Sequence, residues 1–183
     1  MKIFAVYLKI NLTEKPDWFD DFRSLYSPRS ILHITLVQPR YIEEDDIESV
    51  KEKVAQVLSE FVFTEDDKKI IFDATDIEKD ADGDSSFLWF IQENKLIVNL
   101  QKRLVEGLKN FSKYCNEITK QYESNFKPHM TVTDAIQNRA EVVELLSRDQ
   151  KCAGVLTELV LPIVKDKSIE ETENPKNILL FKL

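Results

Sequence analysis

Little in this 183-residue sequence is typical of a fibrous, cross-linked or membrane-spanning protein. It contains three Gly and six Pro, too few for a collagen-like or low-complexity chain. Its two cysteines, Cys115 and Cys152, belong to no paired-cysteine motif, so we expect free thiols and a cytoplasmic location. Lys9 interrupts the apolar N-terminus before a secretory signal could form. Because no apolar run approaches the roughly 20 residues that cross a bilayer, no membrane association is expected.

Positive charge is also scarce, since 25 basic residues stand against 33 acidic ones and the formal net charge is −8. Such a chain is not suited to gripping a long polyanion over its whole surface, because that mode of binding depends on many phosphate contacts and on counterion release. If a nucleic acid binds, a local patch must hold it. With 43% apolar residues and the length of one ordinary domain, residues 1–183 are expected to form a single, monomeric unit.

The apolar pattern predicts strands interspersed with helices. Alternating and β-branched segments predict strands at residues 2–10, 30–37, 70–72, 87–91, 130–132, 155–164 and 177–183. Apolar residues at helical spacing predict helices at residues 16–26, 46–61, 96–111 and 138–147. Pro162 indicates that its strand lies at a sheet edge or ends there. The mixture predicts an α+β fold.

The chain has only two histidines, and each begins the same pattern of His, apolar, Thr, apolar. The two copies are His33-Ile34-Thr35-Leu36 and His129-Met130-Thr131-Val132. One copy alone is more often structural than functional, but two copies that use every histidine are not expected by chance. Side chains alternate between the faces of a strand, so each copy presents its His and Thr on one face, about 7 Å apart at Cα. Its apolar residues then point to the core.

Two imidazoles and two hydroxyls around one space suit in-line displacement at phosphorus. A neutral imidazole can accept the proton of the attacking group, and a protonated one can donate to the leaving oxygen. Threonine hydroxyls can bind the non-bridging oxygens. A metal site would need a third ligand at a metal-binding spacing, and none accompanies the histidines. We therefore predict phosphoester chemistry without metal or cofactor, with His33 and His129 catalytic and with Thr35 and Thr131 on the phosphate.

On these two motifs, the sequence resembles the two-histidine phosphoesterase superfamily, which includes RNA 2',3'-cyclic phosphodiesterases, also called 2'-5' RNA ligases. The phrase Phe126-Lys127-Pro128-His129 is similar to the family's second motif, whose histidine often follows Pro. Two departures are Leu32 before the first histidine and the lack of a basic residue in Val132-Thr133-Asp134-Ala135, which bears on substrate class. The resemblance implies a bilobal α+β fold of two pseudo-symmetric lobes, with antiparallel sheets lining a central cleft and helices packed outside. It also implies that both histidines are catalytic and that no metal is used.

The predicted enzyme opens or hydrolyses a 2',3'-cyclic phosphate or a 2'-5' phosphodiester on an RNA terminus or a small nucleotide. In the alternative hypothesis, the same cleft belongs to a non-catalytic module that binds RNA ends or nucleotide phosphates. Arg40, Tyr41 and Lys127 lie near the motifs in sequence and could contact the substrate, or they could be ordinary surface residues. Trp89 could stack on a base or pack in the core.

Overall fold

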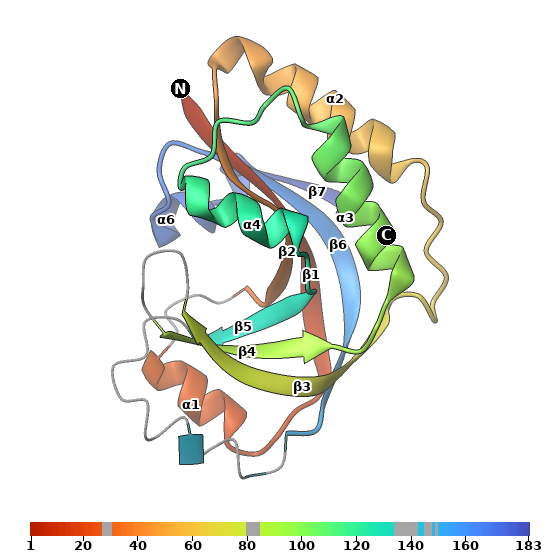
Figure 1. The fold of residues 1–183 in the computed structure, drawn as a ribbon, viewed down its shortest axis with the longest axis vertical. Helices are drawn as coiled ribbons and strands as arrows, with labels where there is room; N and C mark the ends of the chain where they lie inside the picture. Colours follow the sequence, from red (N-terminus) through yellow and green to blue (C-terminus); the bar gives the residue numbers. More distant parts are fainter. Residues whose placement is uncertain (27–30, 80–84, 134–142, 145–147, 149) are drawn as a thin grey trace.

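The computed structural model describes residues 1–26, 31–79, 85–133, 143–144, 148 and 150–183. A seven-stranded antiparallel sheet forms its centre (Figure 1), with the strands β1 (Lys2–Glu14), β2 (His33–Ile42), β3 (Lys69–Lys79), β4 (Ser85–Ile91), β5 (His129–Thr133), β6 (Cys152–Val164) and β7 (Ile178–Lys182). The helices include α1 (Phe19–Tyr26), α2 (Ile47–Leu58), α3 (Lys95–Gly107), α4 (Lys120–Ser124) and α6 (Ile169–Thr172). The predicted α+β class is confirmed. The helix predicted at 138–147 lies largely outside the described residues.

The long strand β6 organises the sheet. Along one edge it pairs with β1, from Val164 opposite Ile3 to Ala153 opposite Glu14. Along the other edge, its first residues pair with β3 and its later residues with β7. Strand β6 is therefore interior, and Pro162 stands near its end, opposite the first residue of β7. Of the two interpretations of this proline, the sheet edge is wrong, because β6 has partners on both sides.

The two motif strands are the two ends of the sheet. The strands follow one another in the order β2-β1-β6-β3-β4-β5, with β7 outside this path. The sheet is strongly curved (Figure 1), so that Cα atoms of β2 and β5 come within 8 Å of each other. Strands that are most distant along the sheet are therefore close in space, on its concave side.

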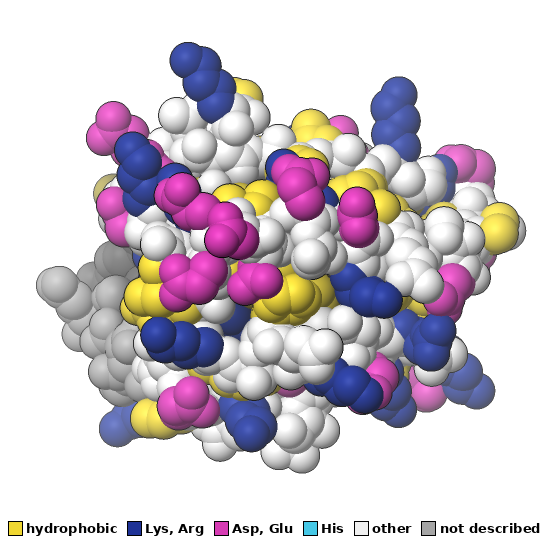
Figure 2. All heavy atoms as spheres, turned by 90° about the horizontal axis from the view of Figure 1, so that it is seen from above, with side chains coloured by type: hydrophobic (Ala, Val, Ile, Leu, Met, Phe, Trp, Pro, Cys, Tyr) yellow, Lys and Arg dark blue, Asp and Glu magenta, His cyan; other side chains and the backbone are white. Residues whose placement is uncertain are grey.

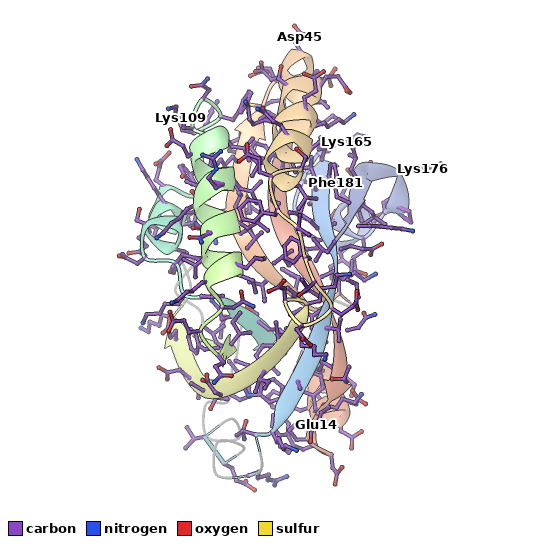
Figure 3. The ribbon with its side chains drawn as sticks, turned by 90° about the vertical axis from the view of Figure 1, so that its right-hand side faces the viewer. Glu14, Asp45, Lys109, Lys165, Lys176 and Phe181 are labelled. Atoms are coloured by element: carbon purple, nitrogen blue, oxygen red, sulfur yellow. The ribbon has the colours of Figure 1, made fainter. Side chains whose placement is uncertain are left out.

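The apolar residues of both motifs are buried, as strand alternation predicts. Ile34 and Leu36 on β2, and Met130 and Val132 on β5, have at most 1% of their surface exposed. Their side of the sheet is covered by helices: α2 and α3 lie side by side near β2 (Figure 3), and α1 lies against the end formed by β4 and β5. The histidines alternate with these core residues and so face the concave side.

Charged side chains of both signs are interspersed on the face shown in Figure 2. Several form ion pairs at the surface, such as Lys51 with Glu48 and Lys109 with Glu106, and pairs of this kind contribute little to stability because solvent screens them. Burial of the apolar faces, rather than surface charge, therefore stabilises the fold. Among the described helices, none has both the length and the apolar character needed to cross a bilayer.

Gly154 allows β1 and β6 to approach closely. A Cβ atom on this residue would lie 2.9 Å from the backbone oxygen of Asn11 and 2.9 Å from Cγ2 of Ile10. We predict that Gly154→Ala lowers the free energy of unfolding by about 1–3 kcal/mol, because the two strands must separate to relieve the overlap. The matched control is Gly107→Ala, whose Cβ would meet side chains at 3.1 Å or more at the end of a helix. Urea denaturation measures both variants, and equal effects would contradict the prediction.

Candidate active site

Both histidines are held by the same local hydrogen bond. Nδ1 of His33 lies 3.2 Å from the carbonyl oxygen of Ile31, and Nδ1 of His129 lies 2.8 Å from that of Lys127. A carbonyl oxygen can only accept, so in each ring Nδ1 carries the hydrogen and donates it. Nε2 is then the nitrogen that gains or loses a proton in each imidazole. The two copies thus present the same tautomer, although they lie at opposite ends of the sheet.

His33 lies beside a cavity of about 200 Å³ on the β1 side of the site. Its ring is in contact with the Tyr7 ring, with centroids 4.6 Å apart. Tyr7 is directly opposite Thr35 in the β1–β2 pairing, so these side chains share the concave face. His33, Thr35 and Tyr7 all line the cavity.

His129 lines a second cavity, of about 280 Å³. Phe90 is its partner in the β4–β5 pairing, and the two rings have centroids 5.6 Å apart. Aromatic and charged groups complete the wall, among them Tyr122, Phe126, Lys127 and Glu78. The cavity therefore combines flat apolar surfaces with charge of both signs around the imidazole.

Thr35 and Gln38 line both cavities and so join them. The structure therefore brings together His33 with Thr35 on one side, and Thr35 with His129 and Lys127 on the other. Thr131 is exposed on β5, two residues from His129 and hence on the same face of the strand. It lines neither of these two cavities.

The two imidazoles differ in their electrostatic surroundings. Burial lowers the pKa of His129 from its ordinary value of 6.5, although the hydrogen bond to Lys127 and the negative charge of Glu78 act to raise it. The neutral form of His129 is therefore favoured near pH 7. A neutral imidazole with its Nδ1 hydrogen fixed can accept a proton at Nε2.

Arg40 is not a substrate contact, because its guanidinium is buried in the protein. Only 1% of the side chain is exposed, and Nη2 lies 2.6 Å from a carboxylate oxygen of Glu123. Nη1 donates to the carbonyl oxygens of Leu108 and Phe111. Tyr114 donates to the same Glu123 oxygen at 2.6 Å, and burial followed by this bond raises the pKa of Tyr114 to about 12. The sequence-based expectation for Arg40 is thus corrected, since both amino groups of its guanidinium are bonded to partners inside the fold.

The buried Arg40–Glu123 ion pair also positions residues that line the two cavities. The second carboxylate oxygen of Glu123 accepts the backbone N–H of Gln38 at 2.7 Å, and Gln38 lines both cavities. Glu123 belongs to α4, and its neighbours Gln121 and Tyr122 line the His129 cavity. One carboxylate therefore fixes β2 and α4 relative to each other.

Trp89 packs in the core and does not face the cavities. It is fully buried, its ring stacks on Phe19 at 5.2 Å between centroids, and its indole N–H donates to Gln150. Tyr41 lies outside both cavities, with the Lys113 amine 5.7 Å from its ring centroid. The expectation that Trp89 could stack on a substrate base is therefore wrong, because Trp89 has the opposite orientation from Phe90 on the same strand.

Several cavity residues were not predicted from the sequence, notably Tyr7, Gln38, Phe90 and Tyr122. Tyr7 is placed at its cavity by the pairing of β1 with β2, and Gln38 is placed by the bond of its backbone N–H to Glu123. Both are long-range contacts, which no local sequence pattern reveals. Phe90 lies on a strand that is buried on both faces, so the alternation of apolar and polar residues gave no signal. In the described part of the chain, no group of three His, Cys, Asp or Glu side chains is placed to hold a metal ion.

The charge of Glu78 provides a test of the His129 environment. We predict an NMR titration midpoint for His129 below 6.5, and a still lower midpoint in Glu78→Gln, because the negative charge that stabilises the imidazolium is removed. The control is Glu65→Gln, which changes a carboxylate paired with Lys68 at the surface. Since the folded pKa lies below the unfolded one, this group's contribution to stability is lost as pH falls from about 6.5 through the folded value. A midpoint above 6.5 would show that burial does not lower the pKa of His129.

The Arg40–Glu123 pair provides a second test. We predict that Glu123→Leu costs about 3–5 kcal/mol of unfolding free energy, because it leaves the Arg40 charge buried and unpaired. The double variant Arg40→Met, Glu123→Leu should recover most of this loss, since no buried charge remains. Urea denaturation of the single and double variants gives the coupling energy. Additive losses would show that the pair is not coupled.

Proteins similar to this chain are found among solved structures but not by sequence. No family model matches the sequence, and a search of the curated proteins finds no match. Among solved structures, Kluyveromyces marxianus Usb1 is similar with a TM-score of 0.55 and 10% identity, over 99% of this chain and 98% of that chain. E. coli LigT in complex with NADP+ gives 0.51 and 11%, over 100% and 96% of the chains. A further phosphoesterase gives 0.50 and 11%, over 98% and 94%.

These similarities extend over the whole chain, at identities too low for a sequence relationship to be evident. They agree with the resemblance that the two His-x-Thr motifs indicated independently of the structure. The chain has the fold of the two-histidine phosphoesterases.

Proposed function

We propose that the protein is a metal-independent phosphodiesterase that opens or hydrolyses a 2',3'-cyclic phosphate or a 2'-5' phosphodiester on an RNA terminus or a small nucleotide. The observation that carries this proposal is the pair of identically oriented histidines. Each ring donates Nδ1–H to the carbonyl two residues before it, and the two strands meet where the sheet curves. A structural role would not require the same tautomer on two strands that are distant in the sheet.

In this proposal, His129 acts as the general base. Its pKa is lowered by burial, so it enters the reaction neutral and can take the proton of the attacking hydroxyl at Nε2. His33, in its protonated form, gives a proton to the leaving oxygen. The roles exchange when the reaction runs in reverse, as microscopic reversibility requires.

Thr35 is the candidate phosphate ligand at the centre of the site, because it lines the cavities of both histidines. Thr131 lies on the same face of β5 as His129 and supplies the second hydroxyl. Hydroxyl donors that bind the non-bridging oxygens stabilise the charge that concentrates there during displacement. Lys127 lines the His129 cavity and adds a positive charge near the phosphate.

A small or terminal nucleotide substrate agrees with the rest of the molecule. Phe90, Tyr122 and Phe126 offer aromatic surface in the His129 cavity, on which a base could stack. LigT, which has the same fold, has been crystallised with the nucleotide NADP+. The net charge of −8 disfavours binding along a long polyanion.

Substitution of either histidine tests the proposal. We predict that His33→Ala and His129→Ala each lower kcat for 2',3'-cyclic nucleotides or 2'-5' dinucleotides by about 10²- to 10⁴-fold, because each removes one proton transfer. The wild-type profile of kcat/KM against pH should be bell-shaped, with the acidic limb missing in His129→Ala. EDTA should leave the rate unchanged.

Circular dichroism of both variants serves as the folding control. Full activity in both variants would overturn the proposed function. Nucleotide binding by the wild type without turnover of any diester tested would instead favour the non-catalytic alternative.

A further inference from the structure

The pairing of β1 with β2 shifts twice in the part of β2 that follows the first motif. Two consecutive residues of β1 pair with Thr35 and Val37, so Leu36 is an extra residue on β2. A second shift lies between Val37 and Arg40, where β2 again has one residue more than β1. Extra residues of this kind are β-bulges, which bend a strand and change the direction of the side chains that follow.

The first bulge changes which side chain follows Thr35 on the concave face. In an unbroken strand, Val37 would follow Thr35 on this face and Gln38 would point into the core. Because of the extra residue, Leu36 and Val37 are both buried, with at most 1% of their surface exposed. Gln38 is half-buried and lines the cavities of both histidines. The bulge therefore places Gln38, rather than Val37, with Thr35 on the concave face.

The backbone of Gln38 is fixed by a buried group on another element. Its N–H donates to a carboxylate oxygen of Glu123 at 2.7 Å, and Glu123 belongs to α4, which packs beside β2 (Figure 1). Among the described residues, none forms a hydrogen bond with the Gln38 carboxamide. Its donor and its acceptor are therefore both available to a ligand in the cavities.

A carboxamide at this position matches a hydroxyl better than a phosphate oxygen. Its amino group donates and its oxygen accepts, and a hydroxyl also does both. A phosphate oxygen carries negative charge and only accepts, so the cation of Lys127 in the His129 cavity suits it better. With the phosphate at Thr35, the sugar that carries it lies at the boundary of the two cavities, where Gln38 is. The polar group of that sugar nearest to the phosphate is the hydroxyl on the neighbouring carbon.

We propose that Gln38 is a specificity-determining residue, which binds the ribose hydroxyl next to the carbon that carries the phosphate. This role rests on the proposed function for the position of the phosphate at Thr35, and it adds the feature of the sugar that the site recognises. A 2'-5' diester carries this group as its 3'-hydroxyl, and so does a 2'-phosphate formed when a cyclic phosphate opens. The hydroxyl donates to Oε1 of Gln38 or accepts from its Nε2.

The test measures the affinity of two nucleotides that bind without turnover. One is adenosine 2'-monophosphate, and the other is 3'-deoxyadenosine 2'-monophosphate, which lacks only the neighbouring hydroxyl. By isothermal titration calorimetry, we expect the wild-type Kd to be about threefold to tenfold lower for the nucleotide that has the hydroxyl, as for one hydrogen bond between neutral groups.

Gln38→Met keeps the length of the side chain and the backbone N–H that Glu123 accepts, but it removes both hydrogen-bonding groups of the carboxamide. It should bring the two Kd values to within about twofold of each other, by weakening the binding of adenosine 2'-monophosphate. A loss of structure at the site would instead weaken both nucleotides by the same factor.

The matched control is Gln56→Met, which makes the same change on the exposed surface of α2, outside both cavities. It should keep the wild-type ratio of the two Kd values. Circular dichroism checks folding, and Gln38→Ala takes the place of the methionine variant if that variant does not fold. The role of Gln38 would be overturned by equal wild-type affinities, by no binding of either nucleotide, or by a wild-type ratio in the Gln38 variant.

Failure of the proposed function gives a different result, because that function is measured as turnover. If no diester is hydrolysed, but the wild-type Kd ratio is present and is lost in Gln38→Met, the role of Gln38 is supported in a non-catalytic site. If diesters are hydrolysed and the two wild-type Kd values are equal, the enzymatic function is supported and the role of Gln38 is overturned.

Discussion

The site depends on one constraint, which is that the two end strands of an open sheet must meet. An end strand exposes a row of backbone donors and acceptors, and these need partners. In β2 the partners come from another part of the chain: Glu123 accepts the N–H of Gln38, Lys113 accepts that of Tyr41, and Cys115 donates to the carbonyl of Pro39. The groups that complete this edge also hold α4 at the cavity of His129. The contacts that complete the hydrogen bonds of the β2 edge therefore also position the candidate site.

The buried Arg40–Glu123 pair is what gives this edge a defined position. Two opposite charges can be buried only where their geometry and their further hydrogen bonds compensate the lost hydration. Glu123 meets that condition with bonds from Arg40, Tyr114 and the Gln38 backbone, and the carbonyl oxygens of Leu108 and Phe111 take up the other amino group of Arg40. Such a network tolerates little displacement. It therefore resists sliding of β2 relative to α4, and any such sliding would alter both cavities.

The sequence predicted which motif side chains share a strand face better than it predicted their surroundings, and the reason is the range of the interactions. His33 and Thr35 fall on one face because of strand alternation, which is a local property that needs no knowledge of the fold. The role of Arg40 could not be predicted, since its partner Glu123 lies 83 positions away. The sequence also did not show which of Trp89 and Phe90 faces the cavity. Both faces of β4 are packed, so its residues do not alternate between apolar and polar. The convergence of β2 and β5 is a property of the whole sheet, and only the doubled motif indicated it.

The two histidines have different surroundings, although their motifs are the same. Both histidines have the same tautomer, set by a carbonyl two residues earlier, so the difference between them must come from what lies around each ring. His129 is desolvated between Phe90 and the α4 wall, which favours its neutral form, while His33 contacts Tyr7 beside a separate cavity. The two motifs have the same sequence pattern, but their histidines lie in different environments. The proposed acid–base catalysis at phosphorus needs that asymmetry, because one imidazole must begin the reaction without the proton that the other carries.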